Sequence, residues 1–255
     1  MHECSSSGSG APYLTIVLPV KDGEERLGET LDEVLRFIAS EPRPCEVIAV
    51  DDGSRDRTPE ILRDYSSRHP CIRVLTHPHN RGKGAALRSG AEASRGEFLL
   101  ALDADSSYAV RSVSSFIQAL ENGADAALGN RRDPRTRFTL HPRHFGYIGL
   151  RHALGWIFNR VARRVVGIGV HDSQCGFKCL RGEIAREVFA KVRADRFSFD
   201  VELVSRLEGE QRAIVELPVL YTYREQKSTV QLVRDGRQML RELLRIRREA
   251  RRGRP

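Results

Sequence analysis

A short apolar stretch that ends in two carboxylates places the strongest constraint on the fold. Residues 98–102 read Phe-Leu-Leu-Ala-Leu and are followed by Asp103 and Asp105. An unbroken apolar run of this length is typical of a strand buried on both faces, as in a parallel sheet covered by helices. Two carboxylates at the carboxyl edge of such a sheet, where α/β proteins bind ligands, could share a hard cation and a substrate phosphate. Alternatively, the two aspartates cap a helix that starts near Ser106.

Apolar runs and helical periodicity alternate along most of the chain. Strands are predicted over residues 13–20, 46–50, 72–75, 98–102, 124–128 and 213–219. Helices are predicted over residues 27–38, 85–91, 112–120, 145–166, 181–192 and 199–207, and a further helix is predicted to begin near residue 58. Residues 171–180 are predicted to form a loop and a short strand. This alternation predicts a single α/β domain with a mostly parallel central sheet flanked by helices.

The ends of the chain differ in composition from its body. Residues 1–12 are polar and rich in serine and glycine, and we expect a disordered lead-in there rather than a signal peptide. Residues 234–255 hold nine arginines and three carboxylates, which accounts for +6 of the net charge of +8. The nearly neutral body argues against a broad nucleic-acid-binding face. Five scattered cysteines favour a reducing, cytoplasmic location.

Polar residues follow other predicted strands as well. Asp51 and Asp52 come directly after residues 46–50 and could accept hydrogen bonds from a nucleobase or a ribose. The segment Asn80-Arg-Gly-Lys-Gly84 suggests a phosphate-binding loop with Lys83 as its cation, although it matches neither a Walker loop nor a dinucleotide fingerprint. Each element alone could be an ordinary turn, but their order and spacing together are more specific.

These motifs together resemble the inverting family 2 glycosyltransferases, which have the GT-A (Rossmann-like) fold. In the first half the resemblance rests on Val17-Leu-Pro-Val20 with Glu24, Asp51-Asp-Gly-Ser54, Asn80-Arg-Gly-Lys-Gly84 and Asp103-Ala-Asp105. In the second half, residues 172–178, 197–203 and 216–219 resemble dolichyl-phosphate glucosyltransferases and their polyprenyl-phosphate mannosyl and glucosyl relatives. The resemblance implies a catalytic domain over 13–225, with a nucleotide-sugar half (13–105), an acceptor half (106–225) and a basic tail (226–255).

The resemblance also implies roles for individual residues. The donor, a UDP- or GDP-hexose, is expected to lie near Pro19, Glu24, Asp51, Asp52, Lys83, Asp103 and Ala104. Asp103 and Asp105 would hold Mg²⁺ or Mn²⁺ on its diphosphate. The phosphate of a polyprenyl-phosphate acceptor would be aligned by Arg131, Arg224 and Lys178. Asp200 falls where relatives that act on alcohols often keep a catalytic base.

Two departures from the family pattern leave alternatives open. Relatives often end the module with Gly-x-Ser-Lys, whereas this chain reads Gln226-Lys-Ser-Thr229, and the membrane spans common in lipid-phosphate relatives are not evident. A soluble family 2 enzyme could instead use Asp200 as the base for a small-molecule or polysaccharide hydroxyl. A sugar nucleotidyltransferase is a more distant alternative, since the glycine- and arginine-rich loop expected after its first strand is missing.

The basic tail has two interpretations. At about 100° per residue, Leu232, Met239, Leu243 and Ile246 fall near one helical stripe flanked by arginines. Such a helix could lie on an anionic membrane surface and attach the protein peripherally. Alternatively, the stripe packs on the domain or pairs with a second copy in a homodimer.

Overall fold

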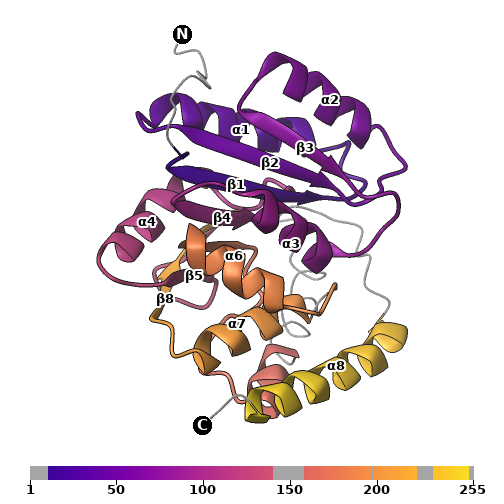
Figure 1. Ribbon diagram of the computed structural model, residues 1–255, viewed down its shortest axis with the longest axis vertical. Coiled ribbons are helices and arrows are strands. Elements are labelled where there is room, and N and C mark those ends of the chain that lie inside the picture. Colours follow the sequence, from indigo (N-terminus) through magenta and orange to yellow (C-terminus); the bar gives the residue numbers. More distant parts are fainter. Residues whose placement is uncertain (1–10, 140–157, 197, 223–231, 253–255) are drawn as a thin grey trace.

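The computed structural model describes residues 11–139, 158–196, 198–222 and 232–252, the last range with side chains for residues 240–250 only. Its central sheet has seven strands in the order β3-β2-β1-β4-β7-β5-β8. In chain order they are β1 (Leu14–Val20), β2 (Cys45–Asp51), β3 (Ile72–Thr76), β4 (Phe98–Leu102), β5 (Ala126–Asn130), β7 (Phe177–Arg181) and β8 (Ile214–Pro218). The predicted α/β domain with a mostly parallel sheet is confirmed (Figure 1).

Helices cover both faces of this sheet because consecutive strand residues point to opposite sides. Ile16 and Leu18 belong to one hydrophobic cluster and Val17, between them, to the other. The first cluster includes residues of α1 (Leu27–Ser40), α2 (Thr58–Arg68), η1 (Val110–Ser112) and α4 (Val113–Glu121). The second includes residues of α3 (Lys83–Ala93), α6 (Gly182–Lys191), α7 (Phe199–Gly209) and α8 (Leu232–Arg252).

The strand β7 is the one antiparallel member of the central sheet. It lies between β4 and β5 and pairs antiparallel with both, with Phe177 opposite Leu102 and Arg181 opposite Phe98. The sequence predicted a short strand here, but periodicity cannot reveal that the chain inserts it into the middle of the sheet. This register brings the start of β7 to the carboxyl end of β4, next to Asp103.

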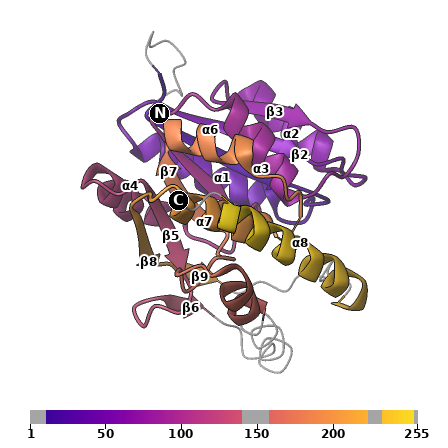
Figure 2. The same ribbon diagram turned by 60° about the horizontal axis from the view of Figure 1, so that its bottom comes forward.

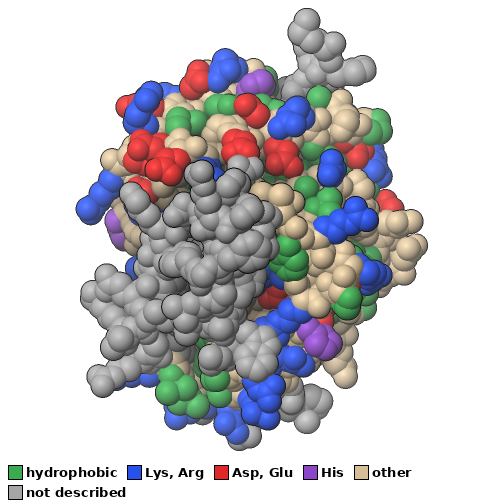
Figure 3. Space-filling model, turned by 180° about the vertical axis from the view of Figure 1, so that it is seen from behind, with side chains coloured by type: hydrophobic (Ala, Val, Ile, Leu, Met, Phe, Trp, Pro, Cys, Tyr) green, Lys and Arg blue, Asp and Glu red, His purple; other side chains and the backbone are tan. Residues whose placement is uncertain are grey.

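Short strands outside the main sheet complete the described fold. The strands β6 (Arg137–Thr139) and β9 (Leu220–Thr222) form a separate parallel pair. Residues 158–166 are helical, whereas the earlier part of the predicted 145–166 helical region lies outside the described residues. On the face shown in Figure 3, acidic and basic side chains are interspersed over the described surface.

The helix α8 packs against the domain through part of its apolar stripe. Leu243 and Ile246 are each only 2% exposed and belong to the second cluster, whereas Leu240 and Leu244 point outward at 49% and 39%. Figures 1 and 2 both show α8 next to α7. Leu243 and Ile246 therefore pack on the domain, as one of the two interpretations of the tail predicted. The outward face of the helix carries Leu240 and Leu244 instead.

Ion pairs fix α8 on the domain at the same place. Arg245 donates to Glu202 of α7 at 3.0 Å, and Arg206 of α7 donates to Glu249 at 3.0 Å. Glu202 is 1% exposed, so its carboxylate depends on these arginines for charge compensation. Two turns of α8 are thus held by both apolar burial and charge.

We predict that Ile246→Ala lowers the free energy of unfolding by about 2–4 kcal/mol, because it removes buried methyl groups and leaves a cavity beneath α8. Leu244→Ala deletes similar atoms from an exposed position and should change stability by less than about 1 kcal/mol. Urea unfolding measures both, and hydrogen exchange of the α8 amides locates the effect. Equal losses from the two substitutions would contradict this packing.

Candidate active site

The loops that follow β1 and β2 are fastened to each other by hydrogen bonds. Ser54 Oγ accepts from the backbone N–H of Asp22 at 2.9 Å, and Asp22 Oδ1 accepts from that of Arg55 at 2.8 Å. The carboxylate of Glu24 accepts from the backbone N–H of Arg57 at 3.0 Å. The structure thus gives Glu24, predicted to lie near the donor, a partner in the neighbouring loop.

The paired aspartates after β2 have different surroundings, although both are buried. Asp51 Oδ1 accepts from the backbone N–H of Ser54 at 2.9 Å. Asp52 accepts from the backbone N–H groups of Arg81 at 2.8 Å and Gly82 at 2.7 Å, and its Oδ1 lies 2.8 Å from His77 Nδ1. Asp52 therefore anchors the loop before α3, and nucleoside contact is better expected of Asp51.

The segment 80–84 is docked on the rest of the protein rather than left open as a cradle. The N–H of Gly84, in the first turn of α3, donates to Asp195 O at 2.8 Å. Gly82 has a φ of +107°, and a Cβ there would clash with the same carbonyl oxygen. The N–H groups of Gly82 and Gly84 are thus bound by protein acceptors. Lys83 is the member of this segment that reaches the strand-end carboxylates.

Three carboxylates and two lysines gather at the carboxyl end of β4. Lys83 Nζ lies 2.6 Å from Asp103 Oδ1, and Lys178 Nζ lies 2.7 Å from Asp200 Oδ1. Burial lowers the pKa of Lys83, but Asp103, Asp200 and Asp105 outweigh burial and raise it above its ordinary value. Burial also raises the pKa of Asp103, helped by Asp105 and opposed by Lys83. The carboxylates exceed the lysines by one charge, so this cluster attracts a further cation.

The carboxylate of Asp103 lies over Gly176, the residue before β7. The N–H of Asp103 donates to Gly176 O at 3.1 Å, and the N–H of Gly176 donates to the hydroxyl of Tyr108 at 3.1 Å. A Cβ at Gly176 would lie far inside van der Waals contact with the Asp103 carboxylate. Only glycine leaves room for that carboxylate. Residues 172–178 carry part of the family resemblance, but the sequence did not predict the positioning roles of Gly176 and Tyr108.

Arg131 is bound by a buried partner from the segment before β7. Its guanidinium donates Nε–H at 2.8 Å and Nη2–H at 2.9 Å to the two oxygens of Asp172, and its backbone N–H donates at 3.0 Å. Burial raises the pKa of Asp172, but the guanidinium outweighs burial and lowers it below its usual range. Lys178 adds to this lowering. Arg131 thus has a structural partner in addition to its predicted role at an acceptor phosphate.

The described residues bring together most of the predicted catalytic and metal-binding set. Asp103, Asp105, Lys83, Lys178 and Asp200 share one edge of the sheet. Pro19 lies within β1 opposite Val50, and Ala104 lies between the two predicted metal ligands. Arg224 and Lys227 lie outside the described residues.

The oxygen ligands offered by the strand-end carboxylates fit a hard divalent cation. Asp103 and Asp105 offer carboxylate oxygens, and no group of three or more His, Cys, Asp or Glu side chains suited to a metal occurs among the described residues. Mg²⁺ and similar cations are commonly held by one or two carboxylates and completed by substrate phosphates and water. Two protein ligands therefore suit a metal that binds together with a diphosphate.

Comparison with known proteins agrees with this geometry. Residues 15–189 match glycosyl transferase family 2. The chain is 34% identical over 225 residues to a dolichyl-phosphate beta-glucosyltransferase of Trichomonas vaginalis, covering 81% of this chain and 63% of the relative. The chain therefore belongs to glycosyl transferase family 2. It spans slightly less than two thirds of that relative's length.

Solved structures show the same fold. A mannosyltransferase of Pyrobaculum calidifontis in complex with GDP-Man and Mn²⁺ superposes with a TM-score of 0.60 at 20% identity, covering 92% of this chain and 64% of that one. Glucosyl-3-phosphoglycerate synthase of Mycobacterium tuberculosis with Mn²⁺ and UDP-glucose gives 0.66 at 18% identity, covering 92% and 79%. In the described part of this chain, no helix has the length and apolar character needed to cross a bilayer.

We predict that Arg131→Ala destabilises the fold by roughly 3 kcal/mol at neutral pH, because it leaves the buried Asp172 carboxylate without its guanidinium partner. Asp172 has a lowered folded-state pKa, so its stabilising contribution is present above its unfolded pKa and is lost as pH falls through the folded value. The penalty should therefore shrink in acid, below about pH 4. Urea unfolding of both proteins from pH 7 to pH 3 measures this. A penalty that is constant across the range would contradict the ion pair.

Proposed function

We propose that this protein transfers a hexose from a UDP- or GDP-sugar to a polyprenyl (dolichyl-like) phosphate, with inversion at the anomeric carbon. The observation that carries the proposal is the cluster of Asp103, Asp105 and Lys83 at the carboxyl end of β4, within a family 2 fold. The name of the dolichyl-phosphate beta-glucosyltransferase relative supports the lipid-phosphate acceptor. The division into a donor half (13–105) and an acceptor half (106–225) is part of the same proposal.

The donor side follows from the loops after β1, β2 and β4. In this proposal Asp51 accepts a hydrogen bond from the nucleoside, and Asp103 and Asp105 would hold Mg²⁺ or Mn²⁺ with the diphosphate. When bound there, the cation would neutralise charge on the departing nucleoside diphosphate, and this contribution would grow as the bond to the sugar breaks. Structural neighbours of this fold carry Mn²⁺ in their described complexes, which supports the same choice here. Lys83, paired with Asp103 at 2.6 Å, can turn towards a phosphate once a metal neutralises that carboxylate.

The acceptor side follows from β7 and α7. Lys178 and Asp200 form a buried ion pair at 2.7 Å, and Lys178 also donates to Cys175 O. A phosphate acceptor is anionic at neutral pH, so it needs positioning more than a general base. Lys178, Arg131 and Arg224 are the cations proposed to align it.

The alternative acceptor is a hydroxyl group with Asp200 as the base. Asp200 already has one oxygen bound to Lys178, which supports a role in holding that lysine rather than in proton abstraction. A sugar nucleotidyltransferase has less support, because the family match and the named relatives are glycosyltransferases.

The direct test of the proposal is transfer from a panel of radiolabelled UDP- and GDP-hexoses to a short-chain polyprenyl phosphate. We expect one donor to give a lipid-linked product only when the polyprenyl phosphate is present. Transfer to a soluble hydroxyl compound but not to the lipid phosphate would overturn the choice of acceptor. The anomeric configuration of the product decides between inversion and retention.

For the donor side, we predict that Asp103→Asn and Asp105→Asn each reduce transfer by about 100-fold or more, because a metal ligand loses its charge. EDTA should reproduce the loss in the wild-type enzyme, and added Mg²⁺ or Mn²⁺ should reverse it. Circular dichroism controls for folding. Full transfer in EDTA would refute the metal assignment.

For the acceptor side, we predict that Asp200→Asn reduces transfer by less than about tenfold, whereas Arg224→Ala costs considerably more. Loss of a positioned general base typically costs about 10²–10⁴-fold. A loss of that size from Asp200→Asn, with near-normal activity of Arg224→Ala, would favour a hydroxyl acceptor. With the donor saturating, kcat and the KM for the acceptor are compared separately, so that a change in acceptor affinity is not mistaken for a change in turnover.

A further inference from the structure

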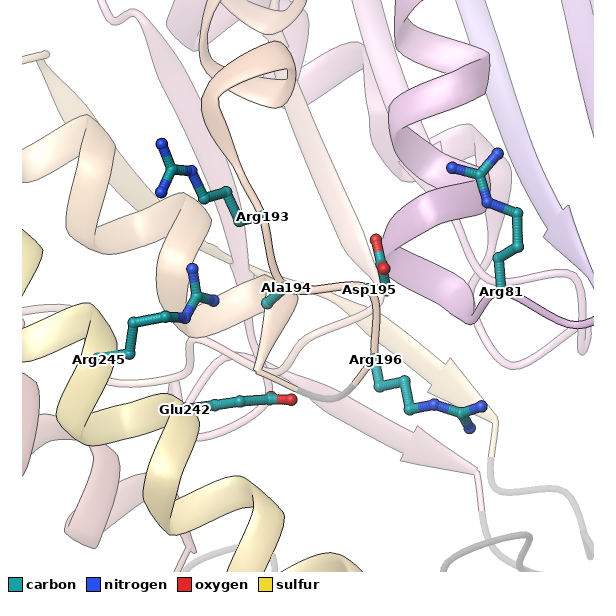
Figure 4. A pocket seen from close by; sticks show the side chains of 7 residues that line it. All are labelled: Arg81, Arg193, Ala194, Asp195, Arg196, Glu242 and Arg245. Carbon is teal, nitrogen blue, oxygen red and sulfur yellow. The ribbon is translucent and has the colours of Figure 1, made fainter.

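A pocket of about 290 Å³ lies where α8 meets the segment between α6 and α7. Its wall comes from three stretches that are far apart in the sequence: Arg81 before α3, residues 193–196, and Glu242 with Arg245 on α8. Figure 4 shows Glu242 and Arg245 extending from α8 towards residues 193–196, with Arg81 on the α3 side. None of the lining residues belongs to the carboxylate cluster at β4.

The lining of this pocket is dominated by guanidinium groups. Four arginines face two carboxylates, and one of the two, Asp195, is already paired with Arg88 outside the pocket. Two of the arginines have partners outside the pocket as well: Arg245 pairs with Glu202, and Arg193 lies 3.8 Å from Glu249. Among the described residues, Arg81 and Arg196 form no ion pair, and both side chains are exposed. The positive charge that the described protein does not neutralise therefore lies on Arg81 and Arg196.

The backbone that carries these arginines is held firmly. The buried carboxylate of Glu202 accepts from the N–H groups of Arg193 at 3.1 Å and Ala194 at 2.9 Å, as well as from Arg245. On the other side, Asp195 O accepts from Gly84 N–H at 2.8 Å. A fixed backbone lowers the ordering cost of binding an anion, because only the arginine side chains then remain to be ordered.

We propose that this pocket binds a phosphate group, as a monoester or a diester. Arginine is the residue best suited to this ligand, because its planar fork donates two parallel hydrogen bonds to phosphate oxygens. A volume of about 290 Å³ lies at the lower end of small-molecule pockets, so it suits a phosphate headgroup rather than a whole nucleotide sugar. The site is separate from the one proposed for the donor diphosphate.

Two sources can supply the same phosphate chemistry. One is the headgroup of an anionic phospholipid, with Leu240 and Leu244 on the exposed face of α8 available to contact acyl chains. The other is a soluble phosphate compound. The proposal concerns the phosphate group in both cases, and it does not depend on glycosyl transfer.

The first experiment titrates inorganic phosphate into the full chain by calorimetry at fixed ionic strength, with chloride as the background anion. The pocket variant is Arg81→Gln with Arg196→Gln, and the matched control is Arg63→Gln with Arg111→Gln, which removes the same charge from exposed positions on α2 and η1. We expect the pocket variant to bind phosphate at least about tenfold more weakly and the control to change less than about twofold. Thermal unfolding confirms that all three proteins are folded.

The second experiment distinguishes the sources by cosedimentation with phosphatidylcholine vesicles, with and without phosphatidic acid. Vesicle binding that requires phosphatidic acid and is lost only in the pocket variant assigns the site to a lipid headgroup. If the pocket variant loses phosphate binding but binds vesicles like the wild-type protein, the site is assigned to a soluble phosphate. The proposal is overturned if the wild-type protein does not bind at about 10 mM phosphate, or if control and pocket variant weaken equally.

Discussion

The antiparallel pairing of β7 with β4 holds the proposed active site together. Through this register Gly176 meets Asp103, and Lys178 is carried to the same edge of the sheet. A parallel strand at this position would present its carboxyl end there instead, and the segment before β7 could not reach Asp103. The pairing therefore joins the half of the domain proposed to bind the donor to the half proposed to bind the acceptor.

Charge balance explains why the strand-end residues are arranged as lysine–carboxylate pairs. Buried carboxylates that lie near one another are costly unless cations compensate them. Lys83 compensates Asp103, and Lys178 compensates Asp200, which leaves the set one positive charge short. A bound divalent cation would more than meet that deficit, and the one positive charge left over, together with Lys83, would attract the phosphates of a donor. The two lysines thus compensate most of the carboxylate charge when no ligand is bound, and the remaining negative charge favours binding of a metal ion with a diphosphate.

Glu202 plays a similar organising role on the helical side of the molecule. Its single buried carboxylate holds the backbone of residues 193–194, the guanidinium of Arg206 and that of Arg245 on α8. The segment it fixes also supplies the carbonyl of Asp195 to the first turn of α3, directly beside Lys83. The position of α8 and that of the strand-end lysine are therefore connected through a few hydrogen bonds. This connection places the arginine-lined pocket close to the proposed active site in the fold.

The sequence by itself determined the fold class and the family. It also determined which strands of the first half are followed by functional motifs. The nearly continuous apolar runs of β1 and β4 are local properties that burial on both sheet faces imposes on every strand of this kind. The resemblance to family 2 glycosyltransferases, read from strand-end motifs, is confirmed. The roles predicted for individual site residues stay predictions.

Only the tertiary structure decided which partners those residues have. It assigned Asp52 to the loop before α3, Asp172 to Arg131, and the first-turn N–H of α3 to Asp195. It also turned Leu243 and Ile246 inward and left Leu240 and Leu244 outside, although all four are leucine or isoleucine in one amphipathic helix. These outcomes depend on contacts between residues tens of positions apart. Sequence periodicity records which side chains prefer burial, but the packed fold alone determines what they are buried against.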